Sequence, residues 1–431
     1  MINMSRYLGR AALCAALALS ILGSSANAQS AASASAAPSS TPAGTEAVPT
    51  VRPEFGVFLQ DAQRLLADKK NQEAADKIQA AEAVTAKTPY ELHILARIKG
   101  ALAVANGNAD MAAQQYELAN TGAWLTAVER VSLLQAVTAL YYNAKDYANA
   151  LSWVDRYFQA GGNDAGMETL RAQSYYLKGD YANAAKALTA EIGKATSAGQ
   201  KPAEIQLRLL ADSRSRVRDE GGHAQALEAL VQYYPNQTRW QSLLVRLWSK
   251  PMLAPSLQLD VFRLQKAAAG LGEASDYTDM AEMALQAGSA VEASAIIEQG
   301  YAAGVLGVGP KAGDAGRLRA KAAKAAVEDR STLEQDVARA KGLPDGLAMF
   351  NYGFTLFQIG QTERGIAQME QGLARGIARH SDSAKLRLVA AYAQMKGADK
   401  ATVWLSTLAG KTDPVGLDDI VRYWGLFLRQ P

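Results

Sequence analysis

Side chains that commonly carry out chemistry are scarce in this sequence. It holds three histidines, His93, His223 and His380, and one cysteine, Cys14. The histidines are far apart, and none has another histidine four residues away, as a helix-borne metal site would require. One cysteine cannot form a disulfide within the chain or supply the ligands of a zinc finger or an iron–sulfur cluster. The sequence therefore predicts no metal site and no cysteine chemistry.

Motifs of the common enzyme classes are also missing. The chain has no H-E-x-x-H, no G-x-S-x-G and no G-x-x-x-x-G-K-[ST]. Gly307, Gly309 and Gly313 form a glycine cluster, but no strand precedes them, as a phosphate-binding loop would require. The many carboxylates fall on polar helix faces without a histidine partner. We expect no catalytic residues, no cofactor and no enzymatic activity.

The composition is that of a globular protein with a large core. Of the 431 residues, 49% are apolar and 20% are charged, and the formal net charge is only +3. A nearly neutral chain lacks the basic surface that binds nucleic acid backbones. The length suits two or three compact domains or one extended repeat array.

The first 28 residues have the pattern of a secretory signal peptide. Arg6 and Arg10 precede an apolar stretch at 11–23, and the sequence Ala-Asn-Ala before Gln29 predicts cleavage between Ala28 and Gln29. The apolar stretch is too short to span a membrane. We expect export to the periplasm. Residues 29–53, rich in Ala, Ser and Pro, predict a disordered linker, which serves either as a tether or as a spacer at the cleavage site.

From residue 54 onward the apolar residues recur with helical spacing, and the sequence repeats itself. The pentapeptide Asp-Tyr-Ala-Asn-Ala occurs at 146–150 and again at 180–184, an offset of 34 residues. Each copy follows an apolar helix that ends in a pair of tyrosines and precedes a second amphipathic helix. The pattern predicts repeated helix-turn-helix hairpins, each too small to bury its own apolar face alone.

These hairpins resemble the tetratricopeptide repeat (TPR). In the second copy, Ala172 and Tyr175 occupy the small and aromatic positions of the first helix, Gly179 lies in the turn, and Ala184 is the small residue of the second helix. A C-terminal copy has Gly365 in place of that alanine. The resemblance implies a stacked array of such units.

The predicted fold class is therefore all-α: a TPR-like α-solenoid of about ten helix-turn-helix repeats after the signal peptide and linker. We expect an N-terminal block of repeats at 54–304 and a C-terminal block with a capping helix at 305–431, because 305–320 is rich in glycine. Besides the three best copies, further turns are expected near Lys70, Gly107, Gly221, Ala254, Gly288, Asp329 and Gly397.

Ligands of TPR proteins lie in the groove formed by the first helices of successive repeats. Transferred to the matching repeats, this resemblance implies a polar and aromatic groove that suits an extended peptide. The alternative is that the aromatic residues pack between helices. The groove positions are Gln135, Tyr142, Asn143, Thr169, Gln173, Tyr176, Phe350, Phe354 and Phe357.

Two other segments have alternative interpretations. The arginines at 208, 214, 216 and 218 are either a solvated face with local ion pairs or a patch for an anionic partner. The aromatic segment 423–428 is either a helix that caps the array or a docking peptide.

The segment 229–240, with Tyr-Tyr-Pro-Asn before Arg239 and Trp240, resembles periplasmic TPR proteins associated with TonB energy-transduction systems. That resemblance implies a scaffold or adaptor that binds protein or peptide segments, accessory to TonB-dependent transport, with TonB, ExbB and ExbD as partners. The alternatives are a structural role in envelope or exopolysaccharide assembly and, less in keeping with the motifs, a peptidoglycan-active enzyme.

Overall fold

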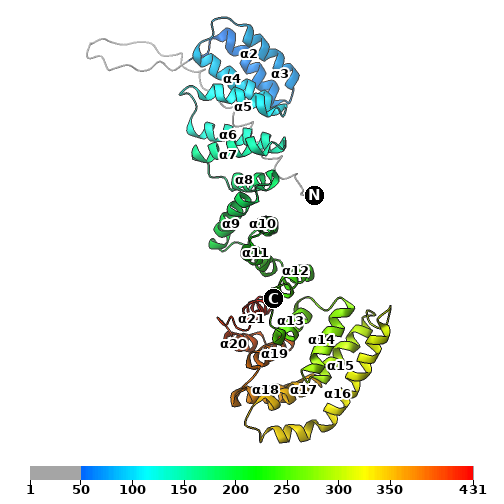
Figure 1. The fold of residues 1–431 in the computed structure, drawn as a ribbon. Helices are drawn as coiled ribbons and strands as arrows, with labels where there is room; N and C mark the ends of the chain where they lie inside the picture. The colour runs from blue at the N-terminus through cyan, green and yellow to red at the C-terminus, as the bar shows by residue number, and fades with distance from the viewer. Residues whose placement is uncertain (1–49, 431) are drawn as a thin grey trace, which may run out of the picture. The chain divides into compact units, whose positions relative to one another are not determined.

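The computed structural model describes residues 50–430, in which all regular structure is helical (Figure 1). It contains 20 α-helices, α2 to α21, and one short 3-10 helix, and this described part has no strand. The all-α, TPR-like fold predicted from the repeat is thus confirmed. The predicted signal peptide, with the cleavage site expected between Ala28 and Gln29, and most of the predicted linker lie outside the described residues. Between residues 50 and 430, no helix has the length and apolar character needed to cross a membrane.

The chain forms two compact units, which divide between Gly199 and Gln200. The first unit consists of four successive helix hairpins, in which each helix packs most closely on its partner in the hairpin. Its helices are α2 (Pro53–Ala67), α3 (Asn71–Ala83), α4 (Pro89–Ala105), α5 (Ala109–Asn120), α6 (Ala127–Asn143), α7 (Tyr147–Gln159), α8 (Ala165–Lys178) and α9 (Tyr181–Ser197).

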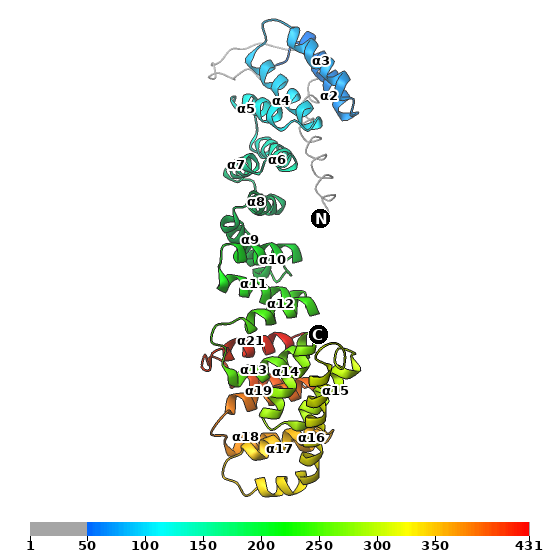
Figure 2. The same ribbon diagram turned by 45° about the vertical axis from the view of Figure 1, so that its right-hand side comes forward.

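The second unit contains the hairpins α10–α11, α14–α15, α17–α18 and α19–α20, together with the helices α12, α13, α16 and α21 outside these pairs. Helix α21 packs against α20 but also against α11 and α13, and it lies beside α13 in two views (Figures 1 and 2). The helices are α10 (Glu204–Arg216), α11 (Glu220–Tyr233), α12 (Gln237–Trp248), η1 (Pro255–Leu257), α13 (Gln258–Ala268), α14 (Ala274–Gln286), α15 (Ala290–Ala302), α16 (Ala312–Ala340), α17 (Leu347–Gln358), α18 (Thr362–Arg375), α19 (Ser381–Gln394), α20 (Ala398–Ser406) and α21 (Leu417–Leu428).

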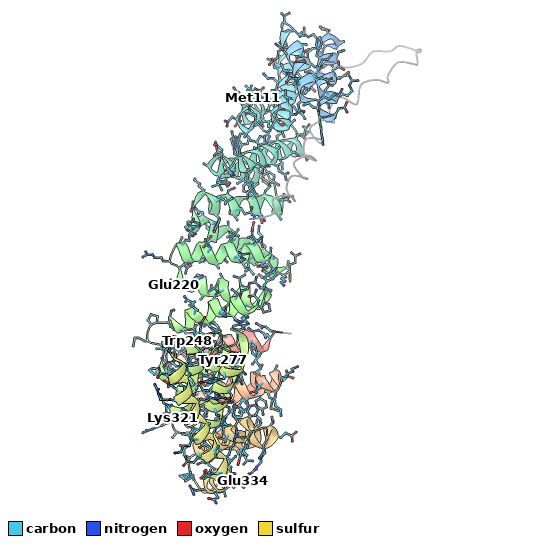
Figure 3. The ribbon with its side chains drawn as sticks, turned by 90° about the vertical axis from the view of Figure 1, so that its right-hand side faces the viewer. Met111, Glu220, Trp248, Tyr277, Lys321 and Glu334 are labelled. Atoms are coloured by element: carbon cyan, nitrogen blue, oxygen red, sulfur yellow. The ribbon has the colours of Figure 1, made fainter. Side chains whose placement is uncertain are left out.

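Helix α16 replaces a predicted hairpin. The turn expected near Asp329 is wrong, because α16 runs unbroken for 29 residues and carries no glycine or proline after Gly316. Its buried residues keep helical spacing from Ala315 to Ala340, while Lys321 and Glu334 are exposed (Figure 3). The helix packs on α14 and α15, so the block boundary expected at 304 and 305 lies inside the second unit.

The repeated pentapeptide has a simple structural explanation in the first unit. Asp146 and Asp180 cap α7 and α9, each accepting a hydrogen bond from the backbone N–H three residues later, at 3.1 and 3.2 Å. Gly179 ends α8 in the left-handed conformation, with φ of 86°. Ala150 and Ala184 are fully buried where the two helices of each hairpin meet. The motif therefore encodes the cap and the close helix contact of each repeat.

The end of the predicted linker belongs to the first unit. Helix α2 begins at Pro53, and Arg52 before it donates hydrogen bonds to both carboxylate oxygens of Glu91, through Nε at 2.9 and 3.2 Å. Glu91 is fully buried and also accepts a hydrogen bond from the Thr88 backbone N–H in a capping box. The Arg52 hydrogen bond lowers the pKa of Glu91 to about 2. This ion pair fixes the start of the folded chain on α4.

Glycines permit an unusually close contact between α17 and α18. A Cβ atom added to Gly365 would lie 2.5 Å from the backbone nitrogen of Phe357, and one added to Gly353 would lie 2.8 Å from the Gly365 carbonyl oxygen. Both distances are far below van der Waals contact. The glycine that departs from the TPR pattern at Gly365 is therefore required by the packing of this hairpin.

Candidate functional site

The predicted groove of the first unit is built from one face of α6 and one face of α8. Gln135 and Tyr142 are seven residues apart, and so are Thr169 and Tyr176, which places each pair on one side of its helix. All four are partly exposed, as is Gln173. The hydroxyl group of Tyr142 donates a hydrogen bond to Oε1 of Gln173 at 2.7 Å. The structure thus joins the predicted positions of two neighbouring repeats.

The two groove tyrosines have equivalent surroundings. Tyr142 contacts the ring of Tyr147 edge to face at a centroid distance of 5.8 Å, and Tyr176 contacts Tyr181 in the same way at 5.5 Å. Asn143, at the end of α6, is exposed. Each repeat therefore presents a partly exposed tyrosine whose ring is held by a second tyrosine, an arrangement that suits contact with a partner at low entropic cost.

The predicted groove positions on α17 are buried. Phe350 is fully buried in the core of the second unit, so its expected place on a groove surface is wrong, and the alternative of packing between helices holds for it. Phe354 and Phe357 are also buried, with their rings stacked at a centroid distance of 6.4 Å. These two line the inner wall of a cavity that is partly open to solvent, where Lys266, Ala267 and Gln394 are exposed.

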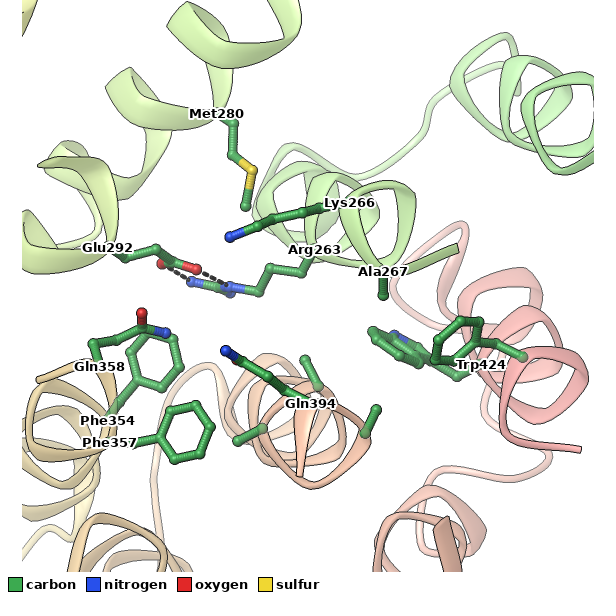
Figure 4. A pocket seen from close by; sticks show the side chains of 14 residues that line it. Arg263, Lys266, Ala267, Met280, Glu292, Phe354, Phe357, Gln358, Gln394 and Trp424 are labelled. Atoms are coloured by element: carbon green, nitrogen blue, oxygen red, sulfur yellow. Dashed lines mark hydrogen bonds and ion pairs between the residues drawn. The ribbon is translucent and has the colours of Figure 1, made fainter. Parts of the chain in front are cut away.

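That cavity has a volume of about 280 Å³ and is lined by side chains from six helices of the second unit (Figure 4). Helices α13, α14, α15, α17, α19 and α21 each contribute to its lining. Its aromatic walls are Phe354 and Phe357 from α17 and Trp424 and Phe427 from α21. Helix α21, which packs on α13, supplies Trp424 and Phe427 to its lining.

One wall of the cavity contains a buried ion network. Arg263 on α13 donates two hydrogen bonds to Glu292 on α15, at 2.9 and 2.7 Å, and one to Asp260, at 2.8 Å. Ser383 on α19 donates to the second oxygen of Asp260 at 2.6 Å. Burial disfavours all three charges and raises the pKa of Asp260, but Arg263 outweighs it at Glu292, whose pKa is lowered. The network joins three helices that are distant in sequence.

A second buried guanidinium, that of Arg387, lies next to this network. It donates a hydrogen bond to Asn351 at 3.0 Å, and its carbon lies 5.1 Å from the centroid of the Phe354 ring. Its Nε has no hydrogen-bond partner in the described chain. Burial, with the nearby charge of Arg263, lowers the pKa of Arg387 to about 10. Both arginines, Arg263 and Arg387, are thus buried and hydrogen-bonded to neighbouring side chains of the second unit.

Lys266 is the cation that remains available to the cavity. It lies one helical turn beyond Arg263 and points into the cavity, with Gln358 and Gln394 on the facing helices (Figure 4). None of these three side chains makes a hydrogen bond or ion pair within residues 50–430. Lys266 and Gln394 are exposed on the open side of the cavity, and desolvation by the surrounding helices lowers the pKa of Lys266. The indole N–H of Trp424, which is 1% exposed, also has no acceptor there.

Of the residues that line the cavity, the sequence had singled out Phe354, Phe357 and the segment 423–428, but not the charged residues of α13 and α15. One signal was present: the 11 residues of α13 include Asp260 and Arg263 at buried positions among Leu259, Phe262 and Leu264. Charged residues inside an otherwise apolar helix face indicate buried pairing, because an unpaired buried charge is very costly.

A second hollow, of about 610 Å³, lies beside α4 and α5 in the first unit. Its rim carries the exposed apolar side chains of Leu92, Leu118 and Trp124. His93 at its wall is buried, with Nδ1 2.9 Å from the carbonyl oxygen of Ala119 and with Nε2 unpartnered in the described residues. Burial lowers the pKa of His93. No group of three or more His, Cys, Asp or Glu side chains with metal-binding geometry occurs among residues 50–430.

The structure also distinguishes between the alternative interpretations of the arginines at 208–218 and of segment 423–428. Arg208, Arg214 and Arg216 each pair with a carboxylate of their own hairpin, as expected for a solvated face, and the fourth arginine, Arg218, is exposed without an ion pair in the described chain. Tyr423 and Trp424 are almost fully buried in the second unit, so segment 423–428 is part of the core and not an exposed docking peptide.

Comparisons with known proteins give only distant likenesses. No protein-family model matches the sequence, and no curated protein matches it. Among solved structures, the TPR2AB domain of yeast Sti1 in its pHSP90 complex is 11% identical, covering 68% of this chain and 98% of that one, with a TM-score of 0.23. Yeast Tom70 is 9% identical, covering 86% and 95%, with a TM-score of 0.24. The TPR domain of P58(IPK) is 12% identical, covering 87% and 98%, with a TM-score of 0.23. At these TM-scores the likenesses support no common function.

Proposed function

We propose that this chain is a non-enzymatic scaffold that binds extended protein or peptide segments on the face of α6 and α8. The observation that carries the proposal is the contact between Tyr142 and Gln173, which joins two neighbouring repeats into one partly exposed surface. Tyr176 extends this surface at the same repeat position 34 residues later.

The chemistry of this face suits main-chain recognition. Tyrosine rings supply apolar contact area, and the amides of Gln135, Gln173 and Asn143 can pair with the N–H and C=O groups of an extended segment. Such binding requires no net charge on the scaffold, in keeping with a formal net charge of +3 over 431 residues. The affinity should therefore depend weakly on salt.

The location and the partner belong to the same proposal. The sequence pattern of residues 1–28 supports export to the periplasm, and segment 229–240 supports a role beside TonB, ExbB and ExbD. We infer an accessory role in TonB-dependent transport, in which the scaffold holds a periplasmic segment of TonB or ExbD.

The test is a titration of the purified full chain with the periplasmic parts of TonB and ExbD. Changing Tyr142 and Tyr176 together to alanine should weaken binding by about 30- to 1,000-fold if both are hot spots. The matched control changes both to phenylalanine, which keeps the rings but removes the hydrogen bond from Tyr142 to Gln173, so the affinity should fall by at most about tenfold. Equal binding by wild type and a folded double-alanine variant would contradict the proposed surface, and no binding by wild type would contradict the TonB partner.

A further inference from the structure

The cavity of the second unit has the features of a site for a small ligand and is separate from the peptide-binding face proposed for the first unit. Its volume of about 280 Å³ is close to twice the roughly 150 Å³ of an apolar cavity that holds one benzene ring. A molecule of about twelve non-hydrogen atoms therefore fits.

The charges around the cavity select the sign and the size of the ligand's charge. Arg263, Arg387 and Lys266 contribute three positive charges, and Asp260 and Glu292 contribute two negative charges, which leaves one positive charge in excess. The carboxylates are bound to Arg263, while Lys266 has no partner among the described residues. One unpaired ammonium group suits a monoanion such as a carboxylate better than a phosphate dianion.

The walls define the rest of the ligand. Phe357, Phe427 and Trp424 offer ring faces and edges, and Ala390 and Ala393 leave space beside them on α19. Aromatic and aliphatic groups gain free energy from burial against such walls. The indole N–H of Trp424 is a donor without an acceptor in the described chain.

We propose that this cavity binds a small apolar or aromatic monocarboxylate, with the carboxylate on Nζ of Lys266 and the apolar part between Phe357, Trp424 and Phe427. The six helices that line the cavity place Lys266 on α13 opposite aromatic side chains from α17 and α21. A ligand there contacts elements that are more than 150 residues apart in sequence, as from Lys266 to Trp424. Occupancy would therefore stabilise the packing of α21 on α13.

The test uses two probes of the same shape, 4-phenylbutyrate and its neutral amide, titrated by calorimetry into the full chain. Because Lys266 is exposed on the open side of the cavity, a charge-assisted hydrogen bond screened by solvent predicts that the acid binds about two- to tenfold more tightly than the amide. Lys266→Met should reduce the affinity for the acid to that for the amide and leave the amide unchanged. Lys321→Met, on the exposed face of α16, should change neither.

A second variant shows whether binding occurs inside the cavity. Ala393→Phe fills the space beside Gln394 and should abolish binding of both probes while circular dichroism remains unchanged. If the acid and the amide bind equally, or if Lys266→Met leaves the acid unaffected, the proposal is wrong. Absence of saturable binding of either probe also refutes it.

A short peptide that ends in phenylalanine, titrated in parallel, tests the class of ligand. If only this peptide binds through Lys266, the assignment of a small molecule is wrong. The peptide-face variants Tyr142→Ala and Tyr176→Ala should bind both probes normally, which separates this proposal from the scaffold function.

Discussion

The buried ion network predicts that replacing Arg263 with methionine destabilises the second unit strongly. The substitution retains most of the side-chain volume but leaves the carboxylates of Asp260 and Glu292, which are 1% and 5% exposed, without their cation. Removing one partner of a buried ion pair costs about 3–5 kcal/mol. Since Ser383 still donates to Asp260, the free energy of unfolding should fall by about 3–4 kcal/mol at pH 7.

The double variant Arg263→Met and Glu292→Gln should recover about 1–3 kcal/mol of this loss, because a neutral amide is less costly to bury than a carboxylate.

The loss of stability in the single variant Arg263→Met also depends on pH. Without Arg263, burial raises the carboxyl pKa values above those of the unfolded chain, so protonation favours the folded state. The deficit relative to wild type should therefore be largest at neutral pH and should shrink as the pH falls toward about 4.

The assay is urea denaturation with hydrogen exchange measured on peptides from α13, α15 and α19, because the two units need not unfold together. The matched control is Arg364→Met, which removes a similar bidentate pair with Glu334 at the surface and should cost at most about 1 kcal/mol. If both variants lost the same stability, or if Arg263→Met lost less than about 1 kcal/mol, the network would not hold these helices together.

Two further predictions concern stability. Gly365→Ala should destabilise the second unit by about 1–3 kcal/mol, because the added Cβ meets the backbone of Phe357. Gly316→Ala, at an exposed position of α16, should instead stabilise it by up to about 1 kcal/mol. Thermal denaturation compares the two variants, and equal effects would contradict the close packing of α17 and α18. Glu91, with its folded pKa lowered to about 2 by Arg52, contributes stability that is present above its unfolded pKa of about 4.3 and is lost as the pH falls toward 2. Glu91→Gln should flatten this acid limb of the first unit's stability in urea denaturation, and an unchanged pH profile would contradict the pairing.

Local features of the fold were predictable from the sequence because they depend on residues close together in the chain. The aspartate caps at Asp146 and Asp180 and the buried alanines at Ala150 and Ala184 follow from one pentapeptide repeated at 34 residues. The turn expected at Asp329 failed because average repeat spacing was extended into a segment without its own turn residues.

The cavity was not predictable in this way. The buried ion network beside the cavity joins Asp260 to Ser383, which are 123 residues apart. The cavity wall includes Trp424, which lies on α21, a helix distant in sequence that packs on α13. Helical spacing shows that Phe350 and Phe354 lie near one helix face, but it does not show whether that face meets solvent or another helix. Only the tertiary packing decides this.

The central claim, that the face of α6 and α8 binds a partner segment, is tested most directly by crosslinking in cells. A photoreactive phenylalanine analogue at exposed Asn143 should give a defined protein adduct that mass spectrometry can identify, and Tyr142→Ala with Tyr176→Ala should abolish it. The same analogue at exposed Ser152 on α7 should give none. Equal adducts from both positions, or none from Asn143, would contradict the account.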